Sequence, residues 1–148
     1  MKKIGILFLI MFGWALSISA QSSPRPSWIN NPPKPSKKGN YYYRVTAAEG
    51  RDYESAYTKA FAMAVYESYS RLQGIAVSIN SSESDIEKNI EQSISTVSSG
   101  QMRLRINNAC HYEEPRTGAM GIKLYVLWQV ANNALDEPKF DYYNKCDK

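Results

Sequence analysis

The residue pair in this chain that most resembles catalytic machinery is Cys110 followed directly by His111. A thiolate activated by a nearby imidazole is a common enzyme nucleophile. In an extended strand, however, successive side chains point to opposite faces of the sheet, so these two side chains cannot form a catalytic pair. We therefore interpret Cys110 as a core residue and His111 as a surface residue.

Other residue patterns that could carry chemistry are weak. His111 is the sole histidine, which leaves a zinc site of the usual His/Cys kind short of ligands. The sequence has no glycine-rich phosphate loop and no nucleophile elbow. Carboxylates such as Glu83, Asp85, Glu87, Glu113 and Glu114 are explained more simply as helix-start charges and turn residues. We expect a non-enzymatic protein without cofactor or metal, and an unrecognised hydrolase is the remaining alternative.

The first 20 residues have the layout of a secretory signal peptide. Lys2 and Lys3 form its basic start, 4–14 its apolar run, and small residues lead to a cut near Ala20. The run is short for a membrane-spanning helix, so an uncleaved anchor is the weaker alternative. No cysteine lies near the cut, which excludes a lipid anchor. We expect an exported protein, periplasmic or extracellular, with no transmembrane segment in the mature chain.

Export changes the arguments from charge and from cysteine. The formal net charge of +4 includes Lys2 and Lys3, so the mature chain would carry +2, too little to indicate a nucleic-acid partner. Cys110 and Cys146 would reach an oxidising compartment, where a disulfide between them is chemically sensible. Pairing does not follow from sequence without geometry, so two unpaired thiols stay an equal alternative.

A proline-rich leader arm, 21–40, precedes the part of the chain with periodic patterning. It holds five of the seven prolines, which favour extended backbone and exclude a helix. Trp28 stands among them, and we expect its ring to dock the arm onto the domain. The domain covers 41–131, and 132–148 is a polar tail without clear periodicity.

The domain alternates between strand and helix patterns. Segments with every second side chain apolar indicate strands, and segments with apolar residues three or four apart indicate helices. The expected strands are 41–48, 75–79, 101–113 and 121–131; the expected helices run from the N-cap Asp52 to Leu72 and from a capping box at Ser84 and Glu87 to Gly100. The last two strands would form an antiparallel hairpin.

This order, β-α-β-α-β-β, predicts an α+β two-layer sandwich. The sheet would be four-stranded and mainly antiparallel, with both helices on one face. Ala56, Ala60 and Ala64 lie one helical turn apart, and such small residues let a helix approach a sheet closely.

The other face of this sheet is the candidate binding surface. Strand alternation places Tyr41 and Tyr43 with the core and leaves Tyr42 outside. Interleaved aromatic and cationic side chains can stack on and pair with ligands. The alternative is an ordinary solvated face of an antiparallel sheet, which has a similar composition and no binding role. The outer set comprises Tyr42, Arg44, Thr46, Arg103, Arg105, His111, Lys123, Tyr125 and Leu127.

Several short motifs together resemble a known family. They are "PSWINNPP", "YYYRVTAAEG", "AYTKAFAMAV" and the closing "IKLYVLWQV". Over roughly 28–131 the chain is similar to the Lpp-twenty type of small bacterial envelope lipoprotein, and to the N-terminal domain of a flagellar T-ring assembly protein. The resemblance implies an envelope location, an α+β fold and no known catalytic residues. Two features depart from it, because the lipobox cysteine is absent and Thr46 stands where the family has glycine.

We therefore expect a secreted or periplasmic envelope protein that binds a protein partner or itself. The contact would use the outer sheet face or an exposed strand edge. The alternative is a module that binds an anionic envelope polymer, such as a glycan, through Arg44, Arg103, Arg105 and Lys123.

Overall fold

The computed structural model describes residues 24–34, 38–73, 83–99 and 104–147. The elements in these ranges are a 3-10 turn η1 (Ser27–Ile29), strand β1 (Tyr41–Gly50), helix α1 (Tyr53–Leu72), helix α2 (Glu83–Ser98), strand β2 (Ile106–Pro115) and strand β3 (Ile122–Ala131). The described strands form one antiparallel sheet in the order β1-β3-β2. The α+β class is confirmed, while the expected strand at 75–79 lies outside the described residues.

β3 is the central strand and is paired along its length on both sides. β1 pairs with it from Tyr41 opposite Ala131 to Gly50 opposite Ile122. β2 pairs with it as the expected antiparallel hairpin. Gly121 closes the hairpin turn with a φ of +107° and lies against the Gly50 carbonyl, a conformation and a spacing that favour glycine.

α1 begins and packs as the sequence predicts. The Asp52 side chain accepts a hydrogen bond from the Ser55 backbone N–H at 2.9 Å, and the Ser55 hydroxyl accepts one from the Asp52 N–H. Ala56, Ala60 and Ala64 are fully buried against the helix-side residues of β3. The close approach of this helix to the sheet is therefore confirmed.

The face of β1 that meets α1 is the opposite of the predicted one. Tyr42 and Thr46 point toward the helix, where the Tyr42 hydroxyl donates to Ser68 Oγ at 3.3 Å. Tyr43 packs on the other side of the sheet. The prediction of an outer Tyr42 was wrong because both faces of β1 are covered, so apolar residues do not mark the helix side.

The predicted facing of β2 was also wrong beyond Asn108, because the strand contains a β-bulge. Alternation placed Ile106 and Cys110 on the same side. The register shifts between Asn108 and Cys110, so that Ile106 packs with the helix-side core and Cys110 with the opposite cluster. One extra residue in a strand reverses the alternation beyond it. His111 consequently lies on the helix side of the sheet.

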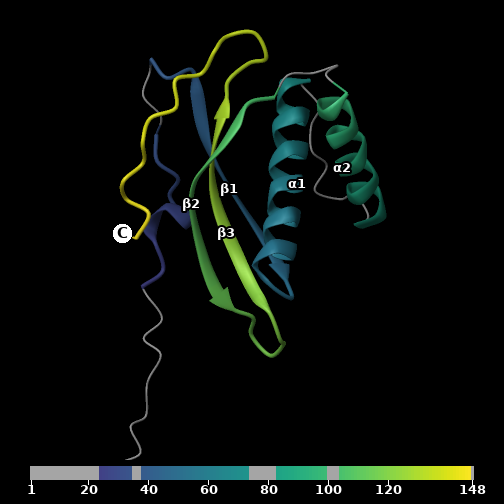
Figure 1. Ribbon diagram of the computed structural model, residues 1–148, viewed down its shortest axis with the longest axis vertical. Helices are drawn as coiled ribbons and strands as arrows, with labels where there is room; N and C mark the ends of the chain where they lie inside the picture. Colours follow the sequence, from purple (N-terminus) through teal and green to yellow (C-terminus); the bar gives the residue numbers. More distant parts are fainter. Residues whose placement is uncertain (1–23, 35–37, 74–82, 100–103, 148) are drawn as a thin grey trace, which may run out of the picture.

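The second face of the sheet is covered by the leader around η1 and by the tail after β3 (Figure 1). Trp28 is 1% exposed and packs there with Tyr125 and Leu127. Tyr143 and Cys146 of the tail join the same cluster. The expectation of an open outer face was wrong, because aperiodic segments can bury a sheet without forming elements of their own.

α2 packs on α1, on the side away from the sheet (Figure 1). The prediction that both helices lie directly on the sheet is therefore correct for α1 and wrong for α2. α2 begins at Glu83, so Ser84 is a helical residue and not the predicted N-cap. The layers are thus leader and tail, sheet, α1 and α2.

Candidate functional site

The predicted basic and aromatic surface is not assembled on one open face. Tyr125 and Leu127 are 6% and 0% exposed beneath the leader and tail. Tyr42 and Arg44 lie on the opposite side, beside α1. Arg103 lies outside the described residues. The sheet therefore separates residues that the sequence interpretation had grouped.

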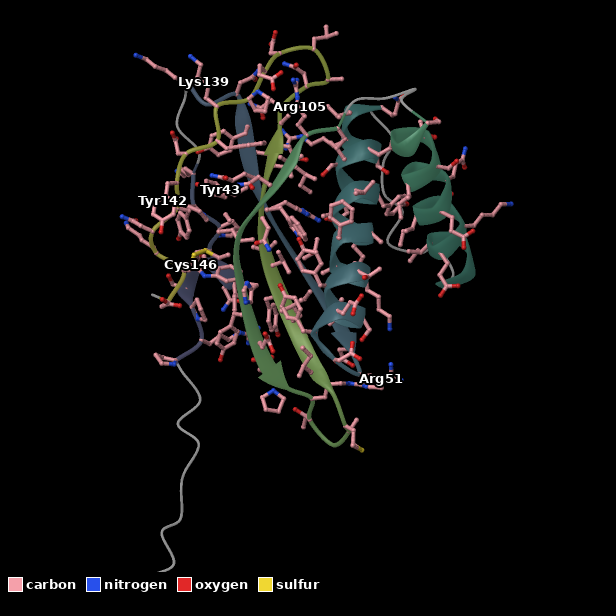
Figure 2. The ribbon with its side chains drawn as sticks, viewed as in Figure 1. Tyr43, Arg51, Arg105, Lys139, Tyr142 and Cys146 are labelled. Atoms are coloured by element: carbon pink, nitrogen blue, oxygen red, sulfur yellow. A yellow bond between two sulfur atoms is a disulfide. The ribbon has the colours of Figure 1, made fainter. Side chains whose placement is uncertain are left out.

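The cations of that set make contacts within the chain. Arg44 forms an ion pair with Glu67 of α1, and this hydrogen bond is the main cause that raises the pKa of Arg44. Arg105 pairs with Glu137 of the tail (Figure 2). The Lys123 ammonium lies 5.3 Å from the centre of the Tyr125 ring in β3. Cations engaged in this way are weaker receptors for an anionic polymer, because the polymer must compete with their present partners.

A different surface stands open on the helix side of the sheet. α1 lies over β1 and β3, and most of the β2 face on that side is left beside the helix rather than under it. Asn108, His111 and Glu113 lie on this face, opposite β3 residues that face the helix. His111 and Glu113 are exposed.

Three aromatic side chains of α1, spaced one turn apart, flank this open face. Tyr53 stacks on Tyr57 with ring centres 5.7 Å apart and planes at 22°. Tyr57 and Phe61 each lie 5.6 Å from the buried Trp128 ring. The edge of Tyr53 meets His111 at 5.3 Å. We call this surface the aromatic strip; it comprises Tyr53, Tyr57, Phe61, Asn108, His111, Glu113 and Trp128.

Contacts between neighbouring rings position the aromatic side chains of the aromatic strip. Tyr53 and Phe61 remain 39% and 38% exposed although they are held by neighbouring rings. Burial raises the pKa of the Tyr53 phenol, and the nearby Tyr57 and Glu113 add to this, so the phenol stays neutral at physiological pH. Such a surface can contribute apolar area and a hydroxyl at low cost in side-chain entropy.

Two features of the described residues bear on the thiol and metal chemistry considered from the sequence. Cys110 is bonded to Cys146, so in this state it carries no thiolate that His111 could activate. Within the described ranges, no group of three or more His, Cys, Asp and Glu side chains is placed to hold a metal ion. In the same part of the chain, neither helix has the length and apolar character needed to cross a membrane.

Sequence reasoning missed the aromatic strip although its signal was present. Tyr53, Tyr57 and Phe61 share one broad apolar arc of α1 with the alanines, and the sequence interpretation used only the alanines of that arc. That arc is wider than the part of the sheet the helix covers. An apolar stripe of about 100° is enough for a helix on a sheet, so the excess width indicated an exposed flank.

Comparison of the chain with family models, with curated proteins and with solved structures finds no match. The similarity of its short motifs to envelope lipoproteins therefore stays an expectation from sequence. Function has to be argued from the geometry of the chain itself.

Proposed function

We propose that this chain is an exported, non-enzymatic cell-envelope protein that acts by binding a protein partner or a second copy of itself through the aromatic strip. One observation carries the proposal: α1 covers the sheet only in part, which leaves Tyr53 and Phe61 more than a third exposed beside the open face of β2. Exposed aromatic area of this kind gains free energy when a partner removes it from water.

The composition of the aromatic strip supports a protein partner. Aromatic residues are enriched at the centres of protein interfaces, where they carry much of the binding energy. Phe61 rests on the Trp128 ring and Tyr53 on Tyr57, so both are pre-positioned. Preorganised side chains lose less entropy on binding.

The edge of β2 is a less suitable contact. In the part of the chain that the structure describes, this edge pairs with no further strand. The bulge between Asn108 and Cys110 breaks its regular hydrogen-bonding pattern. Bulges discourage the addition of another strand, so we assign binding to side chains of the aromatic strip rather than to backbone.

The location in the envelope is supported by two independent features. The first 20 residues have the layout of a signal peptide. A disulfide joins Cys110 to Cys146, and such bonds persist mainly in oxidising compartments. We do not propose that the chain binds an anionic polymer, because Arg44 and Arg105 already form ion pairs with Glu67 and Glu137.

The test compares a strip variant with a matched tail variant. Tyr53→Ala with Phe61→Ala removes exposed rings of the aromatic strip. Tyr142→Ala with Leu135→Ala removes side chains that are 93% and 91% exposed on the tail, with Tyr142 pointing away from the sheet (Figure 2). Light scattering measures self-association, and cross-linking in the native envelope measures partners.

We expect the strip variant to lose the oligomer or the cross-linked partner and the tail variant to keep it. Equal behaviour of the two variants would show that binding, if present, uses another surface. A wild-type chain that is monomeric and gives no cross-link in its native envelope would contradict the binding function itself.

A further inference from the structure

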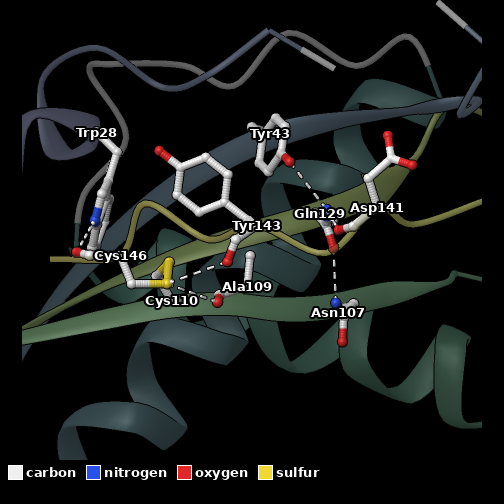
Figure 3. The surroundings of a disulfide bond; sticks show 9 residues. All are labelled: Trp28, Tyr43, Asn107, Ala109, Cys110, Gln129, Asp141, Tyr143 and Cys146. Carbon is white, nitrogen blue, oxygen red and sulfur yellow. Dashed lines mark hydrogen bonds between the residues drawn. A yellow bond between two sulfur atoms is a disulfide. The ribbon is translucent and has the colours of Figure 1, made fainter. Parts of the chain in front are cut away.

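One residue, Cys146, connects three segments of the chain over the sheet (Figure 3). Its sulfur is bonded to that of Cys110 in β2, with the Cα atoms 5.4 Å apart and a sequence separation of 36. Its carbonyl oxygen accepts a hydrogen bond of 2.9 Å from Nε1 of Trp28 in the leader. We call this arrangement the clasp: the Cys110–Cys146 disulfide and the Trp28–Cys146 hydrogen bond.

The clasp lies in the leader and tail segments that cover an apolar face of the sheet, and we call these two segments the cover. Leu127 and Tyr125 of β3 lie beneath it with Val45 of β1. The C-terminal end of the tail also rests its Tyr143 ring against Tyr43, with centres 5.7 Å apart. The leader and tail contribute no strand or α-helix here. Backbone hydrogen bonds join them at Lys139 to Gly39 and at Asn132 to Asn40, so the part of the cover that depends on the clasp is the C-terminal end of the tail.

The two cysteine residues differ in exposure. Cys110 is 4% exposed and sits in the strand. Cys146 is half-buried in the tail, where no regular element surrounds it. Thiol–disulfide exchange requires access along the S–S axis to the sulfur that is attacked. An incoming thiolate can therefore reach Cys146 more readily than Cys110.

We propose that the Cys110–Cys146 bond is a thiol-exchange site whose reduction by a dithiol opens the cover over the sheet. The thiolate of the dithiol attacks Sγ of Cys146, and the S–S bond breaks. Cys110 leaves as a thiolate and takes up a proton. The second thiol then attacks the mixed disulfide, which releases Cys146 as a thiol and leaves the reagent as a disulfide. Two electrons pass from the dithiol to the clasp.

The opening is local because the helix-side core does not depend on the clasp. Ala56, Ala60 and Ala64 pack with Val126 and Trp128 on the other side of the sheet. Reduction therefore frees the C-terminal end of the tail from β2, and the contact between sheet and α1 persists. This inference is independent of the aromatic strip, which lies on that opposite side.

The experiment reduces the oxidised full chain with dithiothreitol and follows two signals. We expect trypsin cleavage after Lys145, an exposed tail residue next to Cys146, to rise at least about tenfold. Far-UV circular dichroism should stay unchanged. The matched variant Cys146→Ser should be cleaved at the reduced rate without reductant and should not respond to it.

Each other outcome overturns the proposal. Unchanged cleavage would mean that noncovalent contacts alone hold the cover. Loss of the far-UV signal would mean that the disulfide supports the whole domain. If Cys146→Ser does not fold, the reduced wild type still decides between these cases. With glutathione as a monothiol probe, we expect the adduct on Cys146; an adduct mainly on Cys110 would contradict the assigned direction of attack.

Discussion

The indole N–H of Trp28 donates a hydrogen bond to the carbonyl oxygen of Cys146, which lies 118 residues further along the chain. The sequence predicted that this ring docks the leader onto the domain. In the structure the ring is 1% exposed and also contacts the last described part of the tail. Trp28 thus joins the beginning and the end of the described chain, with the sheet beneath both.

Replacement of Trp28 should destabilise the protein in two steps. Trp28→Ala removes a buried ring, and we expect it to lower the free energy of unfolding by about 3–5 kcal/mol. Trp28→Phe keeps an apolar ring but leaves the Cys146 carbonyl without this donor, for a loss of about 1–2 kcal/mol. Urea denaturation followed by circular dichroism measures both values. An unchanged midpoint for Trp28→Ala would revive the view that the ring is reserved for a ligand.

Thr46 should be the most sensitive polar residue between the sheet and α1. Its hydroxyl accepts from Nε1 of Trp128 at 2.8 Å and donates to the carbonyl oxygen of Ala60 at 2.9 Å. Thr46→Val keeps the shape, removes both bonds and leaves the buried Trp128 N–H without this acceptor, so we expect a loss of about 1–3 kcal/mol. Thr58→Val, on the exposed side of α1, is the control. Similar denaturation midpoints for the two variants would refute the bridging role.

The alanine ladder should tolerate no enlargement where it meets the sheet. Ala60 has no exposed surface, so Ala60→Leu must push α1 away from β1 and β3, at a cost of about 1–3 kcal/mol. Ala62 lines a cleft of about 580 Å³ between α1 and α2. Ala62→Leu has room there and should change thermal stability little. Equal losses for the two would argue against close packing at Ala60.

Alkaline pH should weaken the contact between β1 and the tail. Burial raises the pKa of Tyr41 above its ordinary value, and hydrogen bonds with Tyr43 and Asp141 add to the effect. A raised pKa in the native state means that the neutral phenol stabilises folding. This stability is complete below the unfolded pKa of about 10 and is lost as the pH rises above it.

The matched variant for this effect is Tyr41→Phe. It removes the 2.9 Å hydrogen bond from Tyr41 to Asp141, and with it the titrating group. We expect a lower stability than wild type near neutral pH and a flatter decline above pH of about 10. Burial also raises the pKa of Tyr143 and Tyr53, so some decline remains. Parallel curves for the two proteins, measured by urea denaturation across this range, would show that Tyr41 is not the source.

Local signals in the sequence predicted part of the fold correctly. The N-cap Asp52, the spacing of the alanines on α1 and the alternation of β3 each depend on neighbouring residues in the chain. They specified α1 from its start to its end, and the side of β3 that it covers. The bridge between Cys110 and Cys146 was left open, because it needs a distance between two points that periodicity does not supply.

The errors about which faces of the sheet are open share one physical cause. Alternation shows which residues of a strand share a face, but not what covers that face. β1 has apolar residues on both sides, and the tail that covers one of them has no periodicity to reveal its path. The candidate surface around Tyr125 was therefore assigned to solvent. The aromatic strip was missed although the apolar arc of α1 is wider than a helix on a sheet needs, because that width was not compared with the area a sheet can cover.

The bulge in β2 determines which residue of this strand can be deleted without changing its pairing with β3. Asn108 stands opposite Trp128 and Cys110 opposite Leu127, so Ala109 is one residue more than the ladder with β3 requires. Deletion of Ala109 would join Asn108 directly to Cys110, whose side chains already lie on opposite faces of the sheet. No side chain of β2 would then have to change faces. We expect this one-residue deletion to fold and to keep its disulfide, as shown by mass under non-reducing conditions. Deletion of Tyr112, by contrast, would move every β2 side chain on one side of the deletion to the opposite face of the sheet. Evolution could therefore shorten this strand at one place without moving the bond that ties the tail to it.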